Sequence, residues 1–244
     1  MLTKLQEKLG PGLLYAATAV GVSHLVQSTR AGALFGITMI AYVVFMSLLK
    51  YPTFLFGARY TSATGDTLID GYERMGKWIL YLFFIMQLFE YTFAIAGVAV
   101  VSAGLVKSVF DINIGDIPMA VGLILSCLAV LAIGRYAWLE DISKALVITF
   151  TLCIILATVI AVAGIDTGGA RLSADLTLDT PTILFLVAVA GWMPTGTTAA
   201  VSISLWIKAK QERLGRAISI AEADLDFNVG YTTAIVTAMC FVTL

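Results

Sequence analysis

The only histidine of this 244-residue chain lies within an apolar stretch, in the sequence GVSH at residues 21–24. Neutral imidazole binds Mn, Fe, Zn, Cu and Ni, and it titrates near neutral pH. His24, Gln27 and Ser28 fall at i, i+3 and i+4, so a helix would place them on one face. The pattern predicts that His24 begins a half-helix and faces a cavity as a metal ligand. The alternative is a neutral histidine that bonds to Gln27 or to a backbone carbonyl.

A second stretch could also supply ligands, "AGWMPTGTT" at residues 190–198. Pro194 has no N–H and clashes with the preceding turn, and glycines on both sides loosen the helix, so we predict a break here. Thr195, Thr198 and Ser202 fall at i, i+3 and i+7, again on one face. The thioether of Met193 is a soft ligand that suits transition metals better than Mg or Ca. The alternatives are packing for the methionine and bonds within the helix for the hydroxyls.

Two ionisable residues within apolar runs are further candidates. Glu90 is expected either to relay protons or to pair structurally. Arg30 can extend outward along its helix, and its charge would oppose cations near an entrance unless Glu90 or another acid neutralises it. Lys50, beside Pro52, is expected to extend to the interface or to pair.

The composition is that of a polytopic helical membrane protein. Hydrophobic residues make up 59% of the chain and charged residues 13%, about half the share usual in soluble domains. The net charge of −1 points away from a nucleic-acid partner. No nucleophile–base–acid set, phosphate-binding glycine loop or cysteine–histidine cluster is present, so we predict no enzyme and no catalytic zinc site.

Seven apolar runs are long enough to be candidate spans, within a single transmembrane domain. They cover about 11–36, 37–60, 77–106, 117–134, 143–164, 181–206 and 229–244. The seventh run has no polar flank at its end, from which we expect a truncated span and a fragment of a longer chain.

The basic residues predict a cytoplasmic N-terminus. With that orientation the opposite loops hold Lys107 and Arg171, while the inner segments hold eleven basic residues, namely Lys4, Lys8, Arg59, Arg74, Lys77, Arg135, Lys144, Lys208, Lys210, Arg213 and Arg216.

The breaks in the first and sixth spans fit the inverted-repeat plan of secondary transporters. In that plan the substrate lies near the membrane midplane between two discontinuous helices. Unwound backbone at this depth is tolerated only inside protein or beside a wet cavity. The fold class we predict is therefore an all-α membrane protein of the LeuT type, of which this chain is the N-terminal part.

Several segments resemble the NRAMP family of divalent-metal transporters. "GPGLLYAA" and "RAGALFG" resemble the family's first helix, and "ARYTSATGDTLIDGY" the end of its second. "GRYAWLEDISKALV" is similar to the link between its fourth and fifth helices, "AGWMPTG" to its sixth-helix motif and "AEADLDFNVGY" to the entry of its seventh. The resemblance covers essentially the whole chain but stops short of the family's ten-helix core.

The chain departs from the family at the residues that hold the metal. The family's first-helix motif reads Asp-Pro-Gly-Asn, and the matching aspartate and asparagine positions are Gly21 and His24. The sixth-helix methionine is kept as Met193, but the histidine after the proline is Thr195. The two backbone carbonyls that the family lends to the metal would belong to Thr18 and Ala190.

The resemblance implies a secondary transporter of divalent metal cations with altered selectivity or coupling. Two other hypotheses stay open, an organic-solute symporter on the same fold and a transport-inactive metal-binding scaffold or sensor. We predict no resident cofactor beyond a transported divalent metal ion. The expected partners are an ion or small-molecule substrate and the lipid bilayer of a bacterial inner membrane, and no oligomeric state follows from the sequence.

Overall fold

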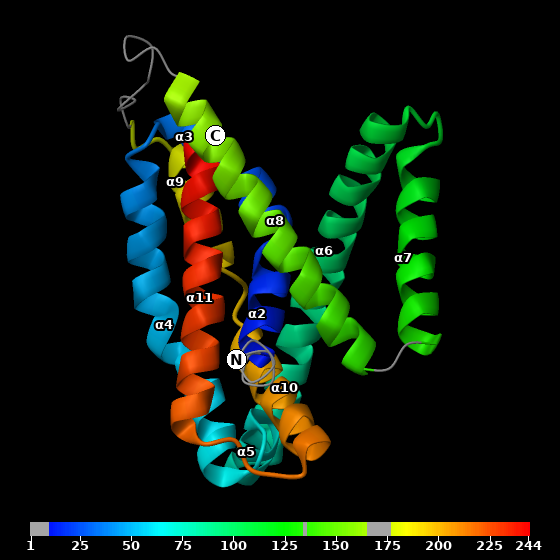
Figure 1. Ribbon diagram of the computed structural model, residues 1–244, viewed down its shortest axis with the longest axis vertical. Helices are drawn as coiled ribbons and strands as arrows, with labels where there is room; N and C mark the ends of the chain where they lie inside the picture. The colour runs from blue at the N-terminus through cyan, green and yellow to red at the C-terminus, as the bar shows by residue number, and fades with distance from the viewer. Residues whose placement is uncertain (1–9, 134–135, 165–176) are drawn as a thin grey trace. The chain divides into compact units, whose positions relative to one another are not determined.

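The computed structural model describes residues 10–133, 136–164 and 177–244, and within these ranges the chain is helical without strands (Figure 1). The elements, in chain order, are α2 (Pro11–Ala19), the π-helix η1 (Ser23–Ser28), α3 (Thr29–Phe35), α4 (Met39–Thr64), α5 (Leu68–Met75), α6 (Lys77–Phe110), α7 (Asp116–Ile133), α8 (Tyr136–Gly164), α9 (Thr180–Trp192), α10 (Ala199–Leu214) and α11 (Ile220–Thr243). The all-α prediction is confirmed for this part of the chain.

Five of the described helices are long and apolar enough to cross a membrane. They are α4, α6, α7, the Ala145–Gly164 part of α8, and α11. The first and sixth predicted spans are absent from this set because each is divided into shorter pieces. Both predicted interruptions are thus present, after Ala19 and after Trp192.

The last helix begins nine residues before the predicted seventh span, at Ile220 and not at 229. A capping box explains the early start. The Ser219 hydroxyl accepts from the Glu222 N–H, and the Glu222 carboxylate accepts from the Ser219 N–H. Asn228 therefore lies inside α11 and not at its entry.

The chain divides into two compact units, of which the second is Tyr72–Ile142 and the first is Met1–Gly71 together with Ser143–Leu244. The predicted single transmembrane domain is not tested by this division and stays a prediction. Within the second unit, α6 packs against α7 through the small residues Ala99, Ala103 and Ala120. Most of its large apolar side chains are exposed, as expected of a surface that faces lipid or further protein.

In the first unit, α11 packs against both α2 and α4 (Figure 1). Glycines allow the backbones of α2 and α11 to touch. A Cβ at Gly12 would lie 1.8 Å from the Asp226 carbonyl oxygen, and one at Gly230 would lie 1.8 Å from the Gly12 carbonyl oxygen. No side chain fits at either position, so glycine at Gly12 and Gly230 is required for this close approach of α2 and α11.

An aromatic cluster fills the space that these three helices enclose. The ring of Tyr15 stacks on Tyr231 with centroids 5.6 Å apart and lies 5.9 Å from Phe54 and 5.7 Å from Phe227. Tyr15, Phe54 and Phe227 are buried almost completely. Each such ring buries a large apolar area and adds about 0.5–1.5 kcal/mol per favourable pair, so α2 has a firm attachment along its first two turns.

Candidate functional site

The first interruption separates α2 from the π-helix η1. The α-helical acceptor of the Gly21 N–H would be the Ala17 carbonyl, but the N–H bonds to Ala19 O instead, at 2.9 Å. The end of α2 therefore leaves carbonyl groups without their helical donors. Helical structure resumes at Ser23 as a π-helix. π-helices are rare in proteins, and those that occur often lie at functional sites.

The second interruption separates α9 from α10. Pro194 has no N–H to offer the Ala190 carbonyl, four residues earlier, so that oxygen loses its helical partner. Met193 is extended, as residues before proline prefer, with φ −93° and ψ 131°. Helical structure returns at Ala199, after Thr198 as the N-cap. Both interruptions lie in the first unit.

The start of α9 is fixed by Asp179. Its carboxylate accepts from the Thr182 N–H at 2.9 Å and caps the helix. Hydrogen bonds from the side chain and backbone of Thr182 hold the pKa of the Asp179 carboxyl below its usual value.

Lys50 joins α4 to the second interruption. Its ammonium donates to the Gly191 carbonyl at 2.7 Å and lies 3.4 Å from the Thr195 carbonyl. The C-terminal end of a helix carries a partial negative charge and attracts cations. Sequence reasoning left Lys50 as an interfacial or paired residue and missed this role, and no spacing rule could have found it because α4 and α9 are distant in sequence.

His24 is wholly buried and bonds across to α11. Its Nε2 lies 3.0 Å from the Ala234 carbonyl oxygen, and because a carbonyl only accepts, Nε2 must carry the proton. Nδ1 then holds a lone pair. The Ser23 hydroxyl has one hydrogen and two acceptors within reach, Ala19 O at 3.1 Å and Nδ1 at 3.2 Å. The imidazole is thus tied to a neighbouring helix and keeps one nitrogen able to accept.

Met193 is also wholly buried, and its sulfur contacts the first interrupted segment. The Ser28 hydroxyl donates to the Met193 Sδ at 3.5 Å. Met193 belongs to a buried apolar cluster, whose other members are Ala31, Phe35, Met39, Val43, Val189, Ala238 and Val242. The structure therefore brings η1 and the end of α9 together. It gives His24 and Met193 separate partners, and neither is exposed in this conformation.

The remaining predicted site residues of the first interruption differ in how far they are buried. Thr18 is exposed and its hydroxyl bonds within its own helix, to Tyr15 O at 2.9 Å. Gly21 is exposed. The Gln27 Oε1 is buried and finds no hydrogen-bond donor among the described residues. An unpaired buried acceptor is costly, so Gln27 is a candidate to bind a ligand.

The residues at the second interruption are partly buried, namely Ala190, Thr195, Thr198 and Ser202. The Thr198 carbonyl accepts from the backbone N–H groups of Val201 and Ser202. The Arg30 guanidinium lies over the ring of Phe185 in α9, 5.5 Å from its centroid, which is a cation–π contact. Glu90 lies in α6, in the second unit.

Two cavities adjoin α8 within the first unit. One, of about 330 Å³, lies beside the first interruption and is lined by Ala17 and Val20 together with Ser143, Leu146, Val147 and Phe150. The other, of about 460 Å³, has amide and hydroxyl groups in its wall, and it is lined by Thr151, Ile155, Asn228, Val229, Thr232, Thr233 and Val236. The Thr151 hydroxyl finds no partner among the described residues. The first cavity is about half enclosed, and the second is shallow and largely open.

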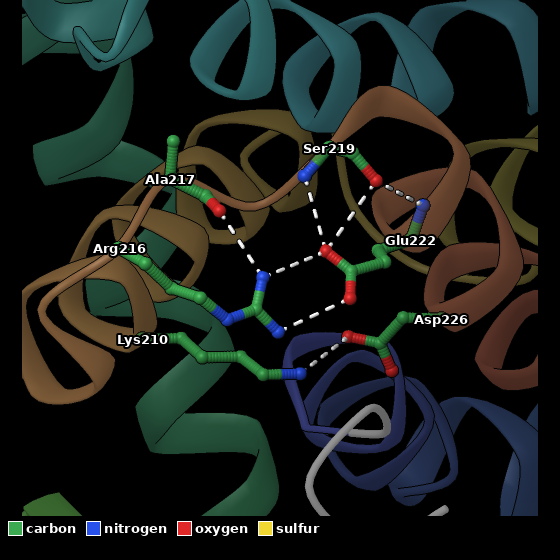
Figure 2. Close-up of polar contacts among 6 residues, drawn as sticks. All are labelled: Lys210, Arg216, Ala217, Ser219, Glu222 and Asp226. Carbon is green, nitrogen blue, oxygen red and sulfur yellow. Dashed lines mark hydrogen bonds and ion pairs between the residues drawn. The ribbon is translucent and has the colours of Figure 1, made fainter.

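A separate cluster of charges lies where α10 ends and α11 begins (Figure 2). Lys210 and Asp226 are buried, with 3% and 4% of their surface exposed, and form an ion pair at 3.8 Å. The other Asp226 oxygen accepts from the Gly10 N–H at 2.9 Å, so the carboxylate also caps α2. Arg216 pairs with Glu222 of the capping box at 2.9 Å. The spacing of Ser219 and Glu222 could have revealed the capping box, but it gives no sign of the buried pair.

Among the described residues, no group of three or more His, Cys, Asp or Glu side chains could hold a metal ion. The donors present at the two interruptions are backbone carbonyls, the Met193 sulfur, the Gln27 amide and the His24 Nδ1 lone pair.

The described chain is thus an all-α protein whose five long apolar helices are those of a multi-pass membrane protein. It is similar to uncharacterized protein PM0681 of Pasteurella multocida (strain Pm70), with 33% identity over 240 residues. The match covers 97% of this chain and 55% of the relative, so the chain spans about half the length of that protein. No family model and no solved structure matches the chain.

Proposed function

We propose that this chain is part of an NRAMP-related secondary transporter that works by alternating access. The observation that carries the proposal is the meeting of two interrupted helical segments, where Ser28 of η1 bonds to Met193 at the end of α9. Freed carbonyls at both interruptions are the groups with which discontinuous helices bind ions. The proposed fold is of the LeuT type, with the two interrupted segments moving around the site.

Divalent metal cations are the first cargo we propose. The NRAMP resemblance supports them, and so does the presence of the Met193 sulfur and the His24 Nδ1 lone pair near the two interruptions. Both residues are buried, so binding requires a conformation that opens the site. Loss of the family's aspartate at Gly21 removes a charged ligand, and we expect weaker metal binding than a carboxylate would give.

A small organic solute is the second cargo candidate. The open pocket of about 460 Å³ favours it, because the Asn228 amide and threonine side chains lie in its otherwise apolar lining. The Lys50 ammonium at the second interruption also disfavours an added positive charge nearby. A pocket with few polar groups in an apolar wall is typical of solute binding.

A flux panel on the full-length protein in liposomes tests both cargo classes. The panel uses Mn²⁺, Mg²⁺, Ca²⁺ and several amino acids and other small organic solutes, with protein-free liposomes as the blank. Flux of Mn²⁺ supports the first candidate, and flux of an organic solute supports the second. Absence of flux for the whole panel, while metal still binds, would leave the scaffold or sensor hypothesis.

Paired methionine variants show whether the sulfur takes part. Met193→Leu keeps the side-chain volume nearly constant and removes the sulfur. Met39→Leu is the matched control because Met39 belongs to the same buried cluster but lies on α4. With metal as cargo, we expect Met193→Leu alone to lower Mn²⁺ flux. Equal flux in both variants would remove the sulfur from the site.

The orientation is part of the proposal. With the N-terminus in the cytoplasm, the end of α10 faces the cytoplasm and the start of α9 faces outside. Glu212 and Thr177 are both exposed and suit single-cysteine labelling once the three native cysteines are replaced. A membrane-impermeant thiol reagent added outside should label Thr177→Cys and not Glu212→Cys. The reverse result would invert the topology.

A further inference from the structure

The end of α9 presents carbonyl oxygens in the arrangement that usually binds a cation. The last four carbonyls of a helix lack donors from their own helix, and Pro194 cannot provide one. Two carbonyl groups of this interruption, those of Gly191 and Thr195, point to one nitrogen atom, the Nζ of Lys50, at 2.7 Å and 3.4 Å. Sets of backbone carbonyls of this kind coordinate hard inorganic cations in proteins.

A lysine is a costly way to satisfy these carbonyls. Lys50 lies in the middle of α4, one of the helices long and apolar enough to cross a membrane, where a charged side chain carries a large penalty. A neutral hydroxyl or amide could have donated to one carbonyl without that penalty. The ammonium offers what an inorganic cation also offers, a compact positive charge with contacts in several directions.

We propose that the Lys50 ammonium is a built-in cation at the second interruption, which takes the place of a bound inorganic cation on the carbonyls of Gly191 and Thr195. The assignment rests on the proposed transport function, because only there does an ion at the interruption have a role in the cycle. It makes Lys50 a specificity-determining residue. An alkali cation cannot share the end of α9 with the ammonium, so the protein needs none there.

The variant Lys50→Met tests the proposal by emptying the place of the ammonium. Purified full-length protein in detergent is unfolded by heat in NaCl, KCl or choline chloride at one ionic strength. The wild type should unfold at the same temperature in all three salts. Lys50→Met should unfold at a lower temperature in choline and recover by a saturable rise of about 5 °C as Na⁺ or K⁺ fills the carbonyls.

Lys208 provides a matched control within the same unit. Its ammonium also donates to a backbone carbonyl at a helix end, that of Gly65, at 2.7 Å. Gly65 follows an uninterrupted helix and no proline removes a donor there. Lys208→Met should lose stability without any difference between Na⁺ and choline. Lys50→Arg, which keeps the charge, should also show no difference between the salts.

Two results would overturn the assignment. One is a folded Lys50→Met protein whose unfolding temperature is the same in Na⁺, K⁺ and choline, and the other is an equal cation effect in Lys208→Met. If Lys50→Met does not fold, Lys50→Gln gives the same comparison with a neutral donor, and failure of both variants to fold in every salt also overturns it. The readout needs no transport, so absence of flux in the wild type would remove the proposed function and leave the cation result standing.

Discussion

The two ends of α2 differ in how firmly the rest of the first unit holds them. At its start, the Gly10 N–H bonds to buried Asp226 and the Gly12 backbone touches α11. At its end, Thr18 and Gly21 are exposed, and a Cβ at Gly21 would meet only the Thr18 carbonyl oxygen, at 3.9 Å. The start of α2 is held by the Asp226 carboxylate and by backbone contact with α11, and we call this contact the joint. The end of α2 has open space around it.

Residues at the start of α2 therefore stabilise the fold, whereas residues at its end have room to contact a ligand. A close-packed joint tolerates no added atom, whereas an interruption with open space can accept one. The comparison also indicates which contacts must change if α2 moves during transport. The joint with Asp226 would have to release the helix before its cytoplasmic end could swing away, in the orientation we propose.

The largest effect is expected at the joint, from Asp226→Ala. The substitution removes the carboxylate that pairs with the buried Lys210 ammonium and that accepts from the Gly10 N–H. Loss of one partner of a buried ion pair costs about 3–5 kcal/mol. The free energy of unfolding, measured in detergent with a chemical denaturant, should fall by this amount, and Asp226→Asn should recover part of it through the N–H bond.

Asp224→Ala is the control for this prediction because Asp224 lies on the same helix, two residues earlier. Its pair with Arg59, at 2.9 Å, is much more exposed than that of Asp226. Exposed pairs add little to stability, so this variant should unfold almost like the wild type. A similar fall in the free energy of unfolding in both variants would show that the buried pair stabilises the protein no more than the exposed pair does.

Gly12→Ala should give the next largest effect, without any change of charge. The added methyl would lie 1.8 Å from the Asp226 carbonyl oxygen, so α2 and α11 must separate. Overpacking of this kind costs about 1–3 kcal/mol, and backbone can relieve it less easily than a side chain can. A thermal unfolding curve that overlays the wild type would mean that the two helices are not in backbone contact.

The sequence predicted the helices far better than their contacts. The long apolar runs predicted the described long helices, and Pro194 and Gly21 predicted the two interruptions. These predictions succeeded because each depends only on residues close together in the sequence. The start of α11 was missed since the run 229–244 was chosen by hydropathy alone. The polar first turns belong to the same helix because Ser219 caps it, and hydropathy does not register caps.

The site was only partly predictable for a related reason. The i, i+4 spacing puts His24 and Ser28 on one side of a helix, and both are buried in η1, but the spacing could not tell which neighbour each would meet. Ala234 and Met193 are distant in sequence, and the choice between them depends on how α11 packs. Lys50 was missed as a ligand of α9 because a lone charge in a span has many uses, and only the fold shows which carbonyls it reaches.

His24→Ala tests the buried side of the first interruption. The variant removes the hydrogen bond to the Ala234 carbonyl and leaves a cavity, with a cost of about 1–3 kcal/mol in the free energy of unfolding. With metal as cargo, Mn²⁺ affinity measured by calorimetry should also fall at least about tenfold, the effect expected for loss of a supporting ligand. Thr198→Ala should change the affinity little. Unchanged Mn²⁺ affinity in His24→Ala would make the histidine purely structural.

The smallest effect on stability is expected at the open end of α2, from Gly21→Ala. The site has room for a methyl group, and Gly21 has no positive φ, so alanine can adopt its conformation. Replacing glycine where the backbone permits it stabilises a protein by about 0.4–1 kcal/mol, because the unfolded chain loses freedom. Gly21→Ala should therefore match or exceed the wild-type unfolding temperature, in contrast to Gly12→Ala on the same helix.

The same open space allows a gain-of-binding test at Gly21. Gly21→Asp places a carboxylate at the position of the aspartate in the NRAMP motif, beside the freed carbonyls that end α2. A charged oxygen ligand binds divalent cations more strongly than neutral dipoles do, so Mn²⁺ affinity should rise at least about tenfold if this interruption contributes to a metal site. Gly21→Asn has nearly the same shape without the charge and should give a smaller rise. Equal Mn²⁺ affinity in the wild type and in Gly21→Asp would show that the end of α2 does not contribute to a metal site, and would favour the organic solute as cargo.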